Sequence, residues 1–248
     1  MSTDVTSCSK CGNQIAFSAN FCGTCGNSLL AIKPAGIPRR LKISLSYFFT
    51  ILLINLLIGY TVDFYTFETD VIASSFLIII TLVYAYGLGY LRSVTFKTHP
   101  SLVAVSVTII SAVLMACMVS YAANWINLVL WEMEYLEIDI YLQTTYPFLF
   151  AMIFTALIPA VFEELAFRGF MFGEIAKNAG AGTALIVTSL LFAIMHLSAI
   201  GLIWYIPGGF LLGFLRLKYK SITYCILAHF FYNLMIIGLD FNKYFTEW

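Results

Sequence analysis

Long apolar stretches dominate the chain after residue 40. Seven of them approach the roughly 20 residues that an α-helix needs to cross a bilayer, although two are short. They occupy residues 41–62, 71–91, 101–130, 146–167, 183–197, 200–215 and 222–239. This pattern predicts an all-α, polytopic membrane helix bundle with about seven transmembrane helices.

The composition agrees with a protein that lies mostly in lipid. Hydrophobic residues make up 61% of the chain and charged residues 10%, and the mean hydropathy is +0.91. These values are far from the averages of soluble domains. Thirteen basic residues balance thirteen acidic ones, which argues against a nucleic-acid partner, because phosphate binding needs clustered cations. The lipid bilayer is the first expected partner.

Basic residues gather in the loops on one side of this seven-helix arrangement. They precede the first helix or follow the second, fourth and sixth: Lys33, Arg39, Arg40, Lys42, Arg92, Lys97, Lys177, Arg216, Lys218 and Lys220. The opposite loops, TVDFYTFETD and WEMEYLEIDI, contain no Lys or Arg. The positive-inside rule therefore predicts a cytoplasmic N-terminus and a C-terminus outside. Residues 1–30 contain no signal-peptide pattern, so we expect no cleaved leader. The expected location is a prokaryotic cell membrane, in which the protein is integral.

Four cysteines near the N-terminus have the spacing of a zinc ribbon. Cys8-x-x-Cys11 and Cys22-x-x-Cys25 both continue as Cys-Gly-Asn, and four thiolates satisfy tetrahedral Zn²⁺. Two disulfides are the alternative, which a reducing cytoplasm disfavours. We predict a zinc ribbon over residues 1–30 with one structural Zn²⁺, possible contact with a protein partner, and a linker over residues 31–40.

Three polar clusters interrupt the apolar stretches in the C-terminal part of the chain. They are Glu163-Glu164-x-x-x-Arg168, Phe192-x-x-x-His196 and His229-x-x-x-Asn233. Ionisable groups at bilayer depth are costly, so they face one another or a wet cavity. The clusters predict an intramembrane site, whereas the simpler alternative is interhelical hydrogen bonding that only holds the bundle together.

Helix geometry predicts different roles for the two glutamates. Residues four apart share a helix face, whereas adjacent residues point about 100° apart. Glu164 can therefore pair with Arg168, and Glu163 is left to meet groups from other helices. At about 1.5 Å rise per residue, Glu163 and His196 reach similar depths on either side of the turn near Asn178.

This arrangement favours amide hydrolysis. A Glu and a His that share a water can generate a nucleophile, and a neutral His N–H with an Asn amide supplies two donors for an oxyanion. We therefore predict Glu163 as the base, acting with His196, and His229 with Asn233 as oxyanion donors. No Ser or Cys occupies a comparable triad, and no HExxH occurs, so covalent and zincin mechanisms are less favoured. Pro159, one turn before the glutamates, should free a backbone carbonyl near the site.

The three clusters, in this order, resemble the EExxxR, FxxxH and HxxxN or HxxxD motifs of the CPBP family, the CAAX protease and bacteriocin-processing (Abi) proteins. The resemblance implies a glutamate-type intramembrane endopeptidase related to the type II CAAX prenyl protease, with an all-helical core and a cytosol-facing cavity. It also implies that Glu163 and His196 activate water, that His229 and Asn233 form the oxyanion hole, and that Glu164 and Arg168 support the site. No metal is expected for catalysis, and the substrate is a peptide or a membrane protein.

The resemblance places the catalytic core at residues 143–248, which leaves residues 41–142 as N-terminal transmembrane helices. Two other classes of function stay open. One is a metal-dependent membrane peptidase with Glu163, His196 and His229 as ligands, although the Asn of the third motif is a poor zinc ligand. The other is a non-catalytic membrane protein, either a transporter or a bacteriocin-immunity factor.

Overall fold

The computed structural model describes residues 5–8, 10–16, 21–27, 37–61, 65–92, 101–131 and 136–247. The chain divides into two compact units, Met1–Pro38 and Arg39–Trp248. Each unit is described by itself. Residues 31–36, most of the predicted linker, lie outside the described residues.

The small unit is built from two similar turns. Strands β1 (Val5–Ser7) and β2 (Gln14–Ala16) pair antiparallel on either side of the first turn. In that turn the Gly12 amide donates to the Cys8 carbonyl at 2.8 Å, and in the second turn the Gly26 amide donates to the Cys22 carbonyl at 2.9 Å. Both glycines have a positive φ, +74° and +69°, which an L side chain rarely adopts. Each Cys-x-x-Cys-Gly therefore closes back on its own first cysteine.

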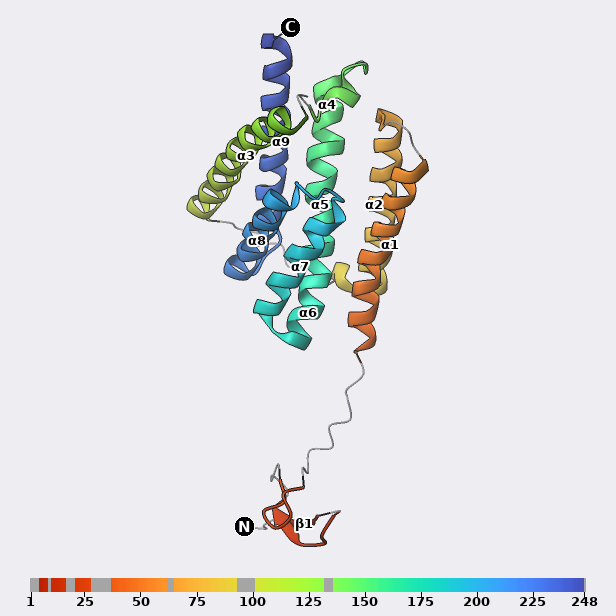
Figure 1. The fold of residues 1–248 in the computed structure, drawn as a ribbon, viewed down its shortest axis with the longest axis vertical. Helices are drawn as coiled ribbons and strands as arrows, with labels where there is room; N and C mark the ends of the chain where they lie inside the picture. Colours follow the sequence, from red (N-terminus) through yellow and green to blue (C-terminus); the bar gives the residue numbers. More distant parts are fainter. Residues whose placement is uncertain are drawn as a thin grey trace. The chain divides into compact units, whose positions relative to one another are not determined.

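The large unit is a helix bundle, which confirms the predicted fold class (Figure 1). Its described residues form seven long helices: α1 (Arg39–Thr61), α2 (Phe67–Gly87), α3 (Leu102–Trp131), a continuous fourth helix over 147–179, α7 (Ala181–Met195), α8 (Leu202–Tyr219) and α9 (Thr223–Glu247). Two short 3₁₀ turns, η1 (Tyr90–Arg92) and η2 (Asp139–Tyr141), lie in connections. Five of the seven helices are long and apolar enough to cross a membrane, and α7 and α8 are the other two.

The fourth helix is longer than its apolar pattern suggests. It runs in five segments, α4 (Pro147–Ala151), η3 (Met152–Leu157), α5 (Ile158–Glu164), η4 (Leu165–Met171) and α6 (Phe172–Ala179), of which η3 and η4 are π-helical. Hydropathy falls after residue 167, where the sequence predicts the end, but the backbone continues to Ala179. An ion pair between Lys177 and Glu174, at 3.0 Å, supports the last turns, and Gly180, with φ +88°, ends the helix.

Large apolar side chains cover the outside of the bundle as well as its core. On α1, for example, Tyr47 and Phe48 are buried while Phe49 and Leu53 are more than half exposed. Apolar residues on both faces are expected of a helix that packs on protein on one side and on lipid on the other. The bundle is therefore an integral membrane domain.

Small residues let α7 and α8 approach each other closely. A Cβ at Gly209 of α8 would lie 3.0 Å from both the Cα and the carbonyl oxygen of Ser189 on α7. Glycines at helix contacts of membrane proteins allow this backbone approach. The contact fixes the position of the Gly209 carbonyl, which takes part in the polar site.

Candidate active site

The two adjacent glutamates lie at the junction of two helical geometries. Glu163 and Glu164 end α5, and the π-helical segment η4 begins at the next residue. π-helical turns inside α-helices occur frequently at functional sites. As predicted, the two carboxylates point to different surroundings: Glu164 is fully buried, whereas Glu163 lines a cavity.

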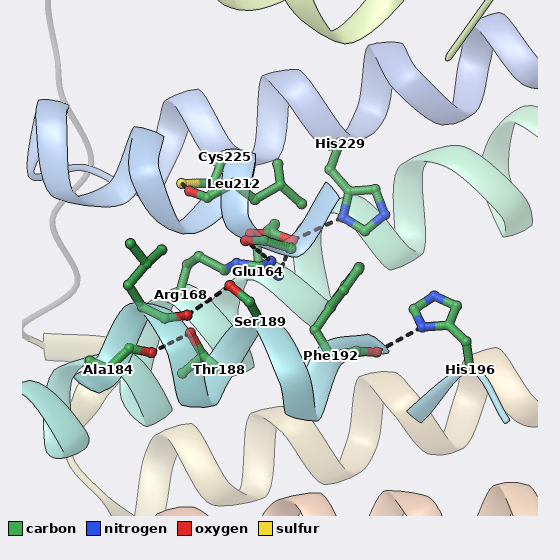
Figure 2. Close-up of polar contacts among 12 residues, drawn as sticks. Glu164, Arg168, Ala184, Thr188, Ser189, Phe192, His196, Leu212, Cys225 and His229 are labelled. Atoms are coloured by element: carbon green, nitrogen blue, oxygen red, sulfur yellow. Dashed lines mark hydrogen bonds and ion pairs between the residues drawn. The ribbon is translucent and has the colours of Figure 1, made fainter. Parts of the chain in front are cut away.

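Glu164 is the centre of a buried polar network (Figure 2). Its Oε1 accepts from Arg168 Nη1 at 2.9 Å and from His229 Nδ1 at 3.0 Å. Arg168 also donates through Nη2 to the Gly209 carbonyl at 2.9 Å. The predicted pairing of Glu164 with Arg168 is therefore present, and the network further joins the fourth helix to α8 and α9.

Arg168 is held on several sides although it has no exposure to solvent. Its guanidinium carbon lies 4.4 Å from the centre of the Phe192 ring, a cation–π contact. Its own backbone carbonyl accepts from Arg216 Nε at 3.0 Å. A buried charge needs a partner and further hydrogen bonds to offset its lost hydration. The bonds to Glu164 and Gly209 supply them at Nη1 and Nη2, whereas Nε has no partner among the described residues.

A cavity of about 1010 Å³ brings the other candidate residues together. Its lining includes Glu163, His196, His229 and Asn233, which come from three different parts of the chain. The Oε2 atom of Glu163 is buried and has no hydrogen-bond partner among the described residues. Glu163 therefore lines the cavity with hydrogen-bonding capacity that no described protein group uses.

His196 is oriented by two neighbours. Its Nδ1 lies 2.8 Å from the carbonyl oxygen of Phe192, and its ring stacks on Tyr205 with 3.9 Å between the centres. A carbonyl can only accept, so Nδ1 carries the proton and Nε2 of the neutral ring is an acceptor. His196 and Glu163 also line a second cavity of about 360 Å³ between α1, α2 and the end of α7.

Asn233 binds the backbone carbonyl that Pro159 leaves without its usual donor. In an α-helix the amide of residue 159 would donate to the carbonyl of residue 155, but proline has no N–H. The Asn233 Nδ2 donates to the Thr155 carbonyl at 2.9 Å instead. The carbonyl that Pro159 was predicted to free near the site therefore has a specific partner, Asn233. The second hydrogen of the Asn233 amide remains for another acceptor.

Two contacts of the site could not be read from the motifs. The bond between His229 and Glu164 joins the first and third motifs, and the stacking of Tyr205 on His196 involves a residue outside all three. No sequence pattern pointed to Tyr205 except its position on α8, shortly after the second motif. The chemical roles assigned to Glu163, His196, His229 and Asn233 remain predictions.

The four cysteines of the small unit form a cluster. Their sulfur atoms all lie within 4.8 Å of one another, and no other such group of three or more His, Cys, Asp or Glu occurs in the described residues. The Sγ atoms of Cys8 and Cys25 are 3.7 Å apart, those of Cys11 and Cys22 are 3.6 Å apart, and all four cysteines are free. The cluster could therefore bind a metal ion, and the disulfide alternative is not formed.

Backbone amides favour the thiolate form in this cluster. The amides of Cys25 and Thr24 lower the pKa of the Cys22 thiol to about 6, and the amides of Lys10 and Cys11 lower the pKa of the Cys8 thiol. A thiolate is the form that binds a metal.

Together, the fold and the site define an integral membrane protein with a buried ionic network beside a large cavity. Residues 145–235 match the family model described as "Type II CAAX prenyl endopeptidase Rce1-like". This segment contains all three motifs, so the resemblance predicted from them is confirmed over these residues. No curated protein and no solved structure matched the chain. The similarity supports a CAAX-type intramembrane protease in general.

The different surroundings of the adjacent glutamates lead to a stability prediction. Glu164→Gln should lower the yield of folded protein and its midpoint of thermal unfolding, because breaking a buried ion pair costs about 3–5 kcal/mol. Glu163→Gln is the matched control and should unfold like the wild type, since its Oε2 has no partner to lose. Thermal unfolding in detergent measures both. Equal destabilisation by the two changes would contradict the network described above.

Proposed function

We propose that the protein is an intramembrane endopeptidase that hydrolyses a peptide bond with a water activated by Glu163 and His196. The observation that carries this proposal is the convergence of Glu163, His196, His229 and Asn233 on one cavity beside the buried Glu164–Arg168 pair. An acid, two imidazoles and an amide around a space large enough for a peptide segment are the groups that amide hydrolysis requires.

In this mechanism a water lies between Glu163 and Nε2 of His196. The Glu163 carboxylate takes one proton of the water while Nε2 accepts a hydrogen bond from the other. The hydroxide oxygen forms a bond to the peptide carbon. Glu163 then returns the proton to the amide nitrogen, and the C–N bond breaks to leave a carboxylic acid and an amine. The Phe192 carbonyl keeps the imidazole in the tautomer that this step needs, and stacking on Tyr205 holds the plane of the ring.

The oxyanion of the tetrahedral intermediate needs donors. Asn233 can offer its second amide hydrogen while the first stays on the Thr155 carbonyl. His229 donates from Nδ1 to Glu164, so its Nε2 is a donor only when the ring carries two protons. The neutral His229 donor expected from the sequence would have to use the Nδ1 hydrogen, which already bonds Glu164. The oxyanion role of His229 requires the charged ring, and the network supplies the Glu164 carboxylate as its counter-ion.

We further propose that the cysteine cluster holds one structural Zn²⁺. Four sulfurs within 4.8 Å of one another are a suitable donor set for a tetrahedral ion. When bound, the zinc would hold the two turns together, because a unit of this size has too little core to fold without such a link. The same proposal includes a location in a prokaryotic membrane with the N-terminus in the cytoplasm. It also includes a catalytic core over residues 143–248 and a protein partner for the ribbon.

Replacement of the predicted base is the main test of the mechanism. Glu163→Gln should lower peptide cleavage by at least about 10²-fold, because the amide keeps the shape but cannot take a proton from water. Purified protein in detergent would be incubated with a defined peptide mixture that includes a prenylated CAAX peptide, and new termini would be detected by mass spectrometry. Wild-type activity in this variant would remove Glu163 from the mechanism. No cleavage by the wild type would favour a non-catalytic function.

Asn233 can be tested apart from its structural contact. Asn233→Ala should lower kcat by about 10²-fold with little change in KM, as expected for one oxyanion donor. The change also removes the donor to Thr155, so a second variant combines it with Pro159→Ala, which restores a backbone N–H at the right position. If the double variant recovers kcat, Asn233 only positions the helix. If kcat stays low while thermal stability returns, Asn233 acts on the reaction.

Metal analysis separates the ribbon from the catalytic site. The full chain should contain one zinc ion, and a variant that combines Cys8→Ser, Cys11→Ser, Cys22→Ser and Cys25→Ser should contain none, because the sulfur ligands are lost. That variant should still cleave peptide and should keep its rate in the presence of 1,10-phenanthroline. Zinc retained by the variant, together with inhibition by the chelator, would instead support the metal-dependent peptidase with histidine ligands.

A further inference from the structure

The large cavity occupies one half of the bundle. Its lining residues on the fourth helix all precede Arg168, and those on α8 all precede Gly213. On α3 they lie between Ala112 and Asn127, toward the C-terminal end of the helix, and on α9 they extend across its middle, from Ala228 to Asp240. Because successive helices run in opposite directions, the segments of α3, the fourth helix and α8 lie toward the same end of the bundle, which is also the end where α9 finishes. We call it the cavity end.

The mouth of the cavity is formed by connections between helices. Glu137, in the α3–α4 connection, and Ser198 and Ala199, in the α7–α8 connection, line the cavity and are exposed. Tyr65, just before α2, is also exposed and lines the cavity. Figure 1 shows α4 and the C-terminal end of α9 at this end, and the α6–α7 turn at the other. The cavity therefore opens where the chain leaves the membrane-spanning helices at the cavity end.

The basic residues lie at the other end. Arg40, at the start of α1, donates to Glu174 of α6 at 3.1 Å and to the Leu88 carbonyl, just after α2, at 2.6 Å. These contacts confirm that the predicted basic ends of α1, α2 and the fourth helix meet. No Lys or Arg lines the cavity among the described residues. Lys243, near the C-terminal end of α9, is the one described basic residue at the cavity end.

The two sequence-based expectations about orientation are therefore incompatible. The resemblance implies a cytosol-facing cavity, whereas the loop charges place the basic end in the cytoplasm. The structure puts the cavity mouth at the end opposite the basic loops. Short loops that follow the positive-inside rule set the orientation of a membrane protein, and here they assign the mouth to the outer face.

We propose that the site is reached from the non-cytoplasmic face of the membrane, and that its substrate is a peptide or a membrane-protein segment exposed on that face. The cleavage step rests on the proposed function, but the direction of access does not. A prenylated C-terminal tail in the cytosol would not meet this mouth. The substrate class is therefore a chain exposed on the non-cytoplasmic face.

Cysteine labelling tests the direction of access. Ala199→Cys, at the mouth, and Ala181→Cys, at the start of α7 beside the basic end, are matched changes of exposed alanines. Spheroplasts that express each variant would be treated with a membrane-impermeant maleimide, with the parent chain as the blank for the native cysteines. We expect labelling of Ala199→Cys in intact spheroplasts, and of Ala181→Cys only after lysis. The reverse pattern, or equal labelling of both before lysis, would overturn the proposal.

Peptide delivery then tests from which face the substrate enters. A mixture of membrane-impermeant peptides that the wild type cleaves in detergent would be added outside intact spheroplasts. We expect cleavage there with the wild type and none with Glu163→Gln. Cleavage in detergent without cleavage from outside would overturn the access proposal and leave the proposed function standing. No cleavage of any peptide in detergent would contradict the proposed function, and the labelling pattern would still decide the direction of access.

Discussion

The buried contact between Glu164 and Arg168 is the interaction on which the rest of the site depends. A charge without exposure is tolerated only when it is paired and hydrogen-bonded, and here the pair shares its bonds with His229 and the Gly209 carbonyl. These bonds connect three helices in a region where apolar side chains gain little from leaving lipid. The network thus fixes the relative rotation of the helices, and with it the direction of Glu163.

A second backbone constraint positions the other side of the cavity. Pro159 removes a helix donor, and Asn233 replaces it from α9. A defect in one helix therefore becomes a specific contact with another. Glu163 follows Pro159 by one turn, so the same deviation from regular helix geometry that binds Asn233 also precedes the candidate base. The site is held on one side by an ion pair and on the other by the hydrogen bond from Asn233 to the Thr155 carbonyl.

Sequence periodicity predicted the parts of the site that lie within one helix. The Glu164–Arg168 pair and the different direction of Glu163 follow from residue spacing alone, and hydropathy identified the seven helices. The bond from His229 to Glu164 depends on how α9 is rotated against the fourth helix, which spacing within either helix does not determine. The length of the fourth helix was underestimated because polar residues near Lys177 lowered the hydropathy without ending the helix. The direction of the cavity required the three-dimensional arrangement, since it depends on which halves of many helices it touches.

The unequal bonding of the helices has a consequence for motion. The fourth helix, α8 and α9 are joined by directional bonds, whereas α1 and α2 pack on the fourth helix largely through aromatic contacts such as Tyr47 with Phe170, 5.1 Å between ring centres. Arg40 ties this pair of helices near the basic end, and Asp70 bonds Tyr141 at the other. Apolar contacts have no fixed direction, so sliding along them costs less than breaking the ionic network. Between these two ties, the α1–α2 pair, which borders the smaller cavity, is thus the wall that can shift at the lower cost while the polar centre keeps its geometry.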